Sequence, residues 1–125
     1  MRNLCVWIDH YEAKIFGITT QEAEMQVVVD GQPKHHIHRK ANHVGLGTDP
    51  MSHEFLEHVA KALGEAKAIL IVGPGKARTE LAGYLNDHFP ALAKRIWAIE
   101  PMDHPSDAEL VAAARKYFLA ATRMH

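Results

Sequence analysis

Cysteine and long apolar runs are nearly absent from this sequence of 125 residues. Cys5 has no second cysteine to pair with, so an intramolecular disulfide is excluded and a reducing compartment is favoured. No window approaches the roughly 18 apolar residues of a membrane span, and Asp9 follows the start too closely for the apolar region of a signal peptide. We therefore expect a cytoplasmic protein that is neither secreted nor embedded in a membrane.

A large net charge is also lacking, since the formal net charge is only -1. With 47% hydrophobic residues the chain has enough apolar surface for one core, and we expect residues 1–125 to form a single domain. There is no internal repeat and no low-complexity tail. Any strongly positive segment is therefore a local feature and not part of a generally basic protein.

The first part of the chain has the pattern of short strands. Residues 4–8, 13–18 and 25–29 are rich in β-branched and aromatic side chains and are separated by polar breaks. This spacing predicts three strands in an antiparallel meander.

The second part alternates between helical and strand patterns. Asp49 and Pro50 predict the start of a helix over about 50–66, and residues 68–72 predict a buried strand. A helix ending before Pro90, a strand at 96–99 and a last helix opened by the Ser106–Glu109 capping box complete the pattern. Three strands followed by helix, strand, helix, strand and helix predict an α/β fold with the five-stranded mixed sheet of ribonuclease-H-like proteins.

The most distinctive segment lies in a loop predicted at about 31–48. It combines three cations and four histidines without an acidic residue: Lys34, His35, His36, His38, Arg39, Lys40 and His43. Cations can neutralise RNA phosphates, and histidines can stack on bases or donate to phosphate when protonated. The alternative interpretation is an ordinary solvated polar loop.

A second candidate contact follows the buried strand, where Gly73, Pro74 and Gly75 turn the chain into the next helix. Gly75, Lys76 and Arg78 would place backbone N–H groups and two cations at a helix start, which favours anions. The spacing of a nucleotide-binding Walker loop is absent. The simpler interpretation is that the glycines serve a tight strand-to-helix turn.

Two segments resemble a known family. The opening hairpin VWIDHYEAKIFGI and the segment AILIVGPGKARTELAGYL, residues 68–85, are similar to the central domain of archaeal and eukaryotic peptide-release factors and of Pelota. Stand-alone bacterial proteins labelled translational machinery proteins share a similar hairpin, a His-rich basic loop, the glycine-proline turn and an ending like Asp103 through Phe118. The resemblance extends over nearly the whole chain.

The resemblance implies a role in translation and points to the basic loop. In release factors the corresponding loop carries a Gly-Gly-Gln tripeptide that assists hydrolysis of peptidyl-tRNA. Here the segment from Lys34 to Gly47 contains no glutamine. The resemblance therefore implies a binding protein of the ribosome or of tRNA that does not hydrolyse peptidyl-tRNA through that motif and needs no cofactor.

Three alternatives stay open. His36, His38 and His43 could form a metal site, because His36 and His38 point to one side of an extended segment. Asp9, Glu100 and Asp103 lie near predicted strand ends and could hold the metal ions of a nuclease, although Asp9 also suits a capping role in the hairpin turn. An exposed sheet edge or the last helix could form a homodimer.

Overall fold

Three strands open the chain: β1 (Asn3–Ile8), β2 (Glu12–Ile18) and β3 (Ala23–Val29). The computed structural model describes residues 2–19, 22–30, 51–64 and 66–124. β2 pairs antiparallel with β1 on one side and with β3 on the other. The predicted meander is therefore confirmed, and each strand begins within two residues of its predicted start.

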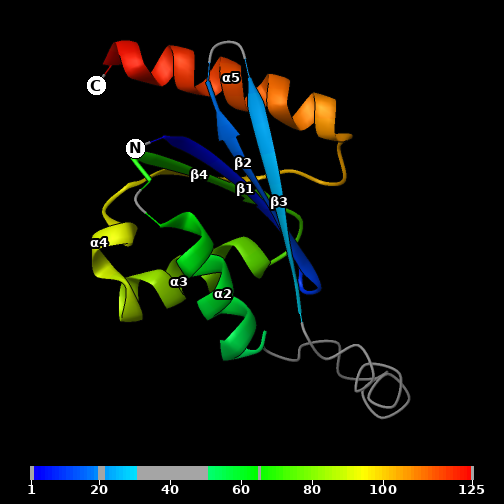
Figure 1. Cartoon of the computed structure of the whole chain (residues 1–125), viewed down its shortest axis with the longest axis vertical. Helices are drawn as coiled ribbons and strands as arrows, with labels where there is room; N and C mark the ends of the chain where they lie inside the picture. Colours follow the sequence, from blue (N-terminus) through cyan, green and yellow to red (C-terminus); the bar gives the residue numbers. More distant parts are fainter. Residues whose placement is uncertain (1, 20–21, 31–50, 65, 125) are drawn as a thin grey trace.

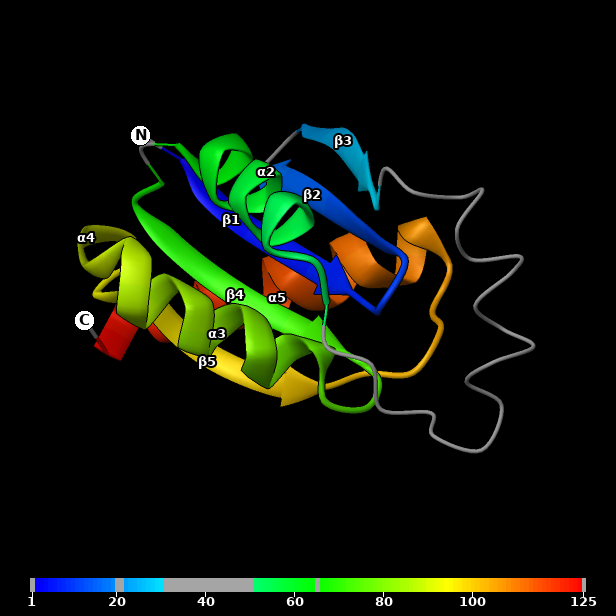
Figure 2. The ribbon, with the colours of Figure 1, turned by 90° about the horizontal axis from the view of Figure 1, so that it is seen from below.

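Two further strands complete a five-stranded sheet with the order β3-β2-β1-β4-β5 (Figures 1 and 2). β4 (Ala68–Gly73) lies parallel to β1, and β5 (Ile96–Pro101) lies parallel to β4. The predicted mixed sheet of ribonuclease-H-like proteins is confirmed. All strands except β2 run in one direction, so Ile8, Val29, Gly73 and Pro101 end at the same side of the sheet, which we name the carboxyl edge.

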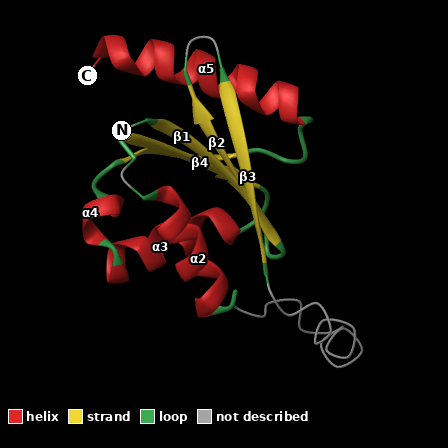
Figure 3. Ribbon diagram, viewed as in Figure 1, coloured by secondary structure: helices red, strands yellow, loops and turns green. Residues whose placement is uncertain are grey.

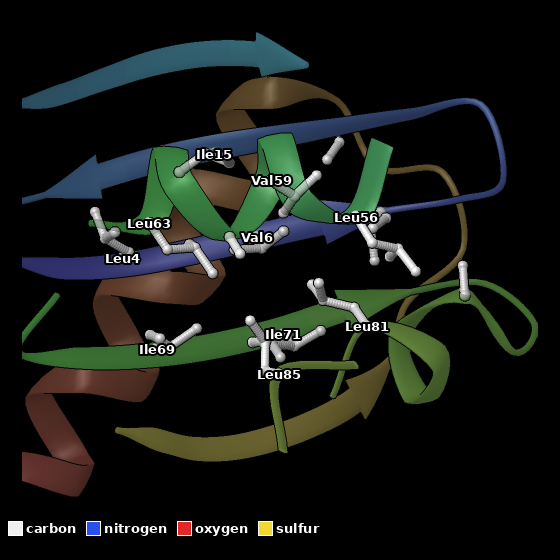
Figure 4. Close-up of a cluster of buried hydrophobic side chains, with 14 of the residues drawn as sticks. Leu4, Val6, Ile15, Leu56, Val59, Leu63, Ile69, Ile71, Leu81 and Leu85 are labelled. Atoms are coloured by element: carbon white, nitrogen blue, oxygen red, sulfur yellow. The ribbon is translucent and has the colours of Figure 1, made fainter. Parts of the chain in front are cut away.

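Helices cover both faces of this sheet (Figures 2 and 3). α2 (His53–Leu63), α3 (Ala77–His88) and the short α4 (Pro90–Ala93) lie on one face, and α5 (Asp107–Met124) lies on the other. Successive strand residues point to opposite faces, so each strand contributes to both cores. The larger core contains side chains from β1, β2, β4, α2 and α3, ten of which are labelled in Figure 4: Leu4, Val6, Ile15, Leu56, Val59, Leu63, Ile69, Ile71, Leu81 and Leu85.

The smaller core lies between the sheet and α5. Its buried members include Cys5, Trp7 and Phe16 from the sheet and Leu110, Ala114 and Phe118 from the helix. Trp97 and Tyr117 pack against this cluster. These aromatic side chains therefore belong to the packing between the sheet and α5. Within the described residues, no helix combines the length and hydropathy needed for a membrane span.

The helix boundaries follow local capping groups and correct two predictions. α2 begins at His53 and not near residue 50, because the side chain of Ser52 accepts the N–H of Phe55 at 3.0 Å and acts as N-cap. It ends at Leu63 and not at residue 66, because Gly64 takes a positive φ of 50°. α3 ends before Pro90 as predicted, whereas α4 was not predicted; it starts with Pro90, which suits a first helical position.

The predicted capping box opens α5. Glu109 N–H donates to Ser106 Oγ at 3.1 Å, and Ser106 N–H donates to a carboxylate oxygen of Glu109 at 2.9 Å. This reciprocal pair satisfies two backbone donors that the helix itself cannot pair. The start of the last helix is thus a local property of the sequence.

Candidate nucleic-acid interface at the carboxyl edge

The two described residues that flank the predicted basic loop are both held at the carboxyl edge. Asp30 directly follows β3, is only 8% exposed, and donates its N–H to the Tyr11 carbonyl at 2.9 Å. Met51 is 4% exposed and donates its N–H to Glu80 Oε2 at 3.4 Å. The loop residues proposed for RNA or metal binding lie outside the described residues: Lys34, His35, His36, His38, Arg39, Lys40 and His43.

Asp9 shapes the turn between β1 and β2 at this edge. Its Oδ1 accepts the N–H of Tyr11 at 2.7 Å and the N–H of Glu12 at 2.9 Å, while its own N–H donates to the Glu12 carbonyl at 3.1 Å. Aspartate side chains commonly stabilise turns in this way. The predicted capping role of Asp9 is confirmed.

The glycine-proline turn after β4 is required by close backbone contact. A Cβ atom on Gly73 would lie 2.2 Å from the carbonyl oxygen of Ile8, and Gly73 has a φ of 150°. Gly75 has a left-handed φ of 59°, which side chains disfavour. The interpretation of these glycines as a tight strand-to-helix turn is confirmed.

The cations that follow this turn differ in what they contact. Arg78 Nη1 donates to the Gly73 carbonyl at 3.0 Å and also to the Gly75 carbonyl, so this side chain ties the turn to α3. Lys76 is exposed and makes no side-chain capping bond at the start of α3. Glu80 places a carboxylate in the first turn of the same helix, and its negative charge opposes the binding of an anion there. Anion binding by Gly75, Lys76 and Arg78 stays a prediction.

Glu80 also connects three elements that are distant in sequence. Its Oε1 lies 3.5 Å from Nε2 of His10, the second residue after β1, and its Oε2 accepts the Met51 N–H. A protonated His10 would strengthen this contact, because an ion pair adds to the hydrogen bond. Neither His10 nor Glu80 was predicted from the sequence, where the available signal is that His10 follows β1 and Glu80 lies in the helix that follows β4. Together they hold Met51, the first described residue after the predicted loop, next to α3 and the turn after β1.

The segment after β5 packs against β1 at the other end of this edge. Trp7 Nε1 donates to the Asp103 carbonyl at 2.7 Å, and the rings of Trp7 and His104 are 5.3 Å apart. His104 Nδ1 lies 2.9 Å from a carboxylate oxygen of Asp103, whose side chain is 91% exposed. Asp103 therefore uses its main chain to anchor the segment and leaves its side chain in solvent.

The carboxylates proposed for a nuclease do not form a metal site. Asp9 is used in the hairpin turn, and Glu100 and Asp103 are exposed. Across the part of the chain that the structure describes, no three side chains from His, Cys, Asp and Glu are grouped so that they could hold a metal ion. The nuclease alternative gains no support from this arrangement.

Solved structures with the same fold include the Pelota protein of Archaeoglobus fulgidus, which is 14% identical with a TM-score of 0.66 over 92% of this chain and 31% of that chain. The archaeal translation termination factor aRF1 is 19% identical with a TM-score of 0.57 over 98% of this chain and 38% of that chain. Dom34 of S. cerevisiae is 11% identical with a TM-score of 0.54, over 97% of this chain and 38% of that chain. The chain shares the fold of one part of these proteins.

The resemblance predicted from the opening hairpin and the glycine-proline turn is confirmed at the level of the fold. The chain spans less than half the length of the solved structures it matches. No family model and no curated protein matches the sequence. Fold similarity at this level of identity does not assign an activity.

Proposed function

We propose that this domain acts in translation as a binding protein, and that it contacts phosphates of ribosomal RNA or tRNA through the basic loop. The observation that carries the proposal is the fold shared with aRF1, an archaeal translation termination factor, and with Dom34, a translation termination-like factor involved in RNA quality control pathways. The absence of glutamine between Lys34 and Gly47 supports binding without hydrolysis by a Gly-Gly-Gln motif.

The charge distribution supports the same site. The segment from Lys34 to Gly47 carries three cations and no acid, whereas the whole chain has a net charge of -1, so the remainder is acidic overall. Negative charge elsewhere on the protein disfavours nonspecific contact with nucleic acid, so the cations of this segment supply the attraction to phosphates. Asp30 and Met51, the described residues on either side of this segment, both lie at the carboxyl edge. We therefore propose the contact with nucleic acid on that side of the sheet.

The test is sedimentation of tagged protein in cell lysate through sucrose gradients at low and high salt. The wild-type protein should travel with ribosomes at low salt, and Arg39→Ala combined with Lys40→Ala should leave it at the top. If each cation neutralises one phosphate, losing two contacts should reduce the slope of log affinity against log salt by about 1.4 to 1.8. The slope can be measured with purified ribosomes or tRNA.

The matched control combines Lys94→Ala with Lys116→Ala, because both lysines are exposed, lie away from the carboxyl edge, and change the net charge by the same amount. This control should travel with ribosomes as the wild type does. If it loses association as strongly as the loop variant, overall charge and not the loop determines binding. If the wild type stays at the top at every salt concentration, the proposed function is wrong.

A further inference from the structure

One edge of the sheet carries an exposed apolar strand. β3 lies at the end of the sheet order, and Met25, Val27 and Val29 are 51%, 44% and 58% exposed. They lie on the face that α5 covers, because they pair with Phe16, Lys14 and Glu12 of β2. α5 packs over β1 and β2, and a groove of about 380 Å³ separates it from Met25. Large apolar side chains exposed in a row mark a surface suited to a partner.

The backbone of β3 presents the same residues to a partner. At the two ends of the β2–β3 ladder, Thr19 N–H donates to the Glu22 carbonyl and Asp30 N–H donates to the Tyr11 carbonyl. The facing pairs Thr19–Glu22 and Tyr11–Asp30 are therefore of the hydrogen-bonded type. In an antiparallel ladder such pairs alternate with pairs whose N–H and C=O groups point away from each other. Residues 24, 26 and 28 therefore bond to β2, and Ala23, Met25, Val27 and Val29 direct their backbone groups to the open edge.

β3 has few of the features that block pairing of edge strands, since Glu24 is its one charged residue. Its seven residues contain no proline and no lysine, and its register with β2 runs from Glu12–Val29 to Ile18–Ala23 without a bulge. The opposite edge strand, β5, ends in Pro101 and pairs with β4 through an irregular register. Of the two edges, β3 is the one able to accept another strand.

The sequence of β3 is complementary to itself in antiparallel orientation. With Gln26 on a two-fold axis, Met25 faces Val27 of the second copy, and Ala23 faces Val29. On the other face Glu24 meets Val28, so no like charges are opposed within β3, and the same register places Glu22 opposite Asp30 just beyond its ends. All four residues with outward backbone groups are paired in this register. A net charge of only -1 adds little repulsion between two copies.

We propose that two copies of this chain associate through antiparallel pairing of their β3 strands, centred on Gln26, to form one continuous ten-stranded sheet. This inference does not depend on the proposed function, since it concerns the side of the sheet away from β4 and β5 and not the basic loop. Isologous pairing of this kind closes at two copies and leaves no further β3 edge exposed.

The oligomeric state is tested by sedimentation equilibrium of the full chain over a wide range of concentration. The mass should rise from 14.0 kDa to twice that value as concentration increases. Val27→Lys should shift the protein to the monomer, because the lysine would be placed against the apolar edge. The matched control is Ile99→Lys, a substitution of an apolar residue of similar exposure, 40% against 44%, on the other edge strand, and it should leave the dimer intact.

The register is tested with Gln26→Cys. Residues facing each other in a non-hydrogen-bonded antiparallel pair have Cα atoms about 4.5 Å apart, a distance that a disulfide can span. Mild oxidation should therefore cross-link two copies, while the buried Cys5 stays reduced. Glu24→Cys should not cross-link, because its partner is Val28. A wild-type protein that is monomeric at all concentrations, or a Gln26→Cys protein that does not cross-link, would overturn the proposal.

Discussion

Replacing Gly73 with alanine should strongly destabilise the fold, because the new Cβ atom would lie 2.2 Å from the Ile8 carbonyl oxygen. An ordinary carbon–oxygen contact is about 3.3 Å, so the ends of β1 and β4 would have to separate by about 1 Å. Forcing alanine into a conformation reserved for glycine costs about 1–3 kcal/mol, and overpacking adds about 1–3 kcal/mol. We expect Gly73→Ala to lower the free energy of unfolding by about 2–6 kcal/mol, a large part of the roughly 5–15 kcal/mol typical of a domain.

Urea unfolding followed by circular dichroism measures this loss. The midpoint should fall while the dependence of the free energy on urea concentration stays the same, since the surface exposed on unfolding is unchanged. Substitutions at two other glycines separate the effect of the backbone conformation from the effect of the close contact. Gly75 has a φ of 59°, but a Cβ atom added there would have no neighbour within 4 Å. Gly75→Ala should therefore lower the free energy of unfolding by only about 1–2 kcal/mol. Gly83→Ala, within α3 and equally free of neighbours, should stabilise by about 0.5–1 kcal/mol. A Gly73→Ala protein within about 0.5 kcal/mol of the wild type would refute the close-contact argument.

Two further predictions concern titratable groups. The Ser106 N–H and then its hydroxyl lower the pKa of Glu109, so the capping contribution is present above the pKa of the unfolded chain and is lost as pH falls through the folded pKa. The stability difference between wild type and Glu109→Gln should therefore disappear in acid, and a difference that persists there would contradict the carboxylate's role. Burial raises the pKa of the Cys5 thiol from 9.0 to about 12, so the free energy of unfolding should fall as pH rises through that interval. At neutral pH a thiol reagent should label Cys5 only in urea, and rapid labelling of the native protein would show that Cys5 is accessible.

The order of strands and helices could be predicted from the sequence because each element carries a local pattern. The strands are short apolar runs bounded by polar residues, and the last helix has its capping box within four residues. The errors are also local. Asp49 and Pro50 resemble a helix start, but the hydroxyl of Ser52 caps α2 instead. The short α4 escaped prediction because four residues are too few for a helical period to be visible.

The candidate site could be predicted only in part. The turn roles of Asp9, Gly73 and Gly75 follow from residue type, since aspartate caps turns and glycine tolerates positive φ. His10 and Glu80 meet although they are separated by seventy positions, and no spacing rule connects them. Asp103 resembled a metal ligand near a strand end, yet its carbonyl binds Trp7 and its side chain faces solvent.

The local properties of this protein follow from its sequence: which segments form strands and helices, where turns need glycine, and where positive charge without acid is concentrated. Which of these features come into contact depends on the tertiary structure. Parallel pairing of β1 with β4 and of β4 with β5 brings three strand ends to one edge, and crossover connections bring His10 to α3. The exposure of Met25, Val27 and Val29 depends on where α5 lies. An alternating apolar strand has the same sequence pattern whether a helix covers it or leaves it open, because burial depends on residues distant in the chain.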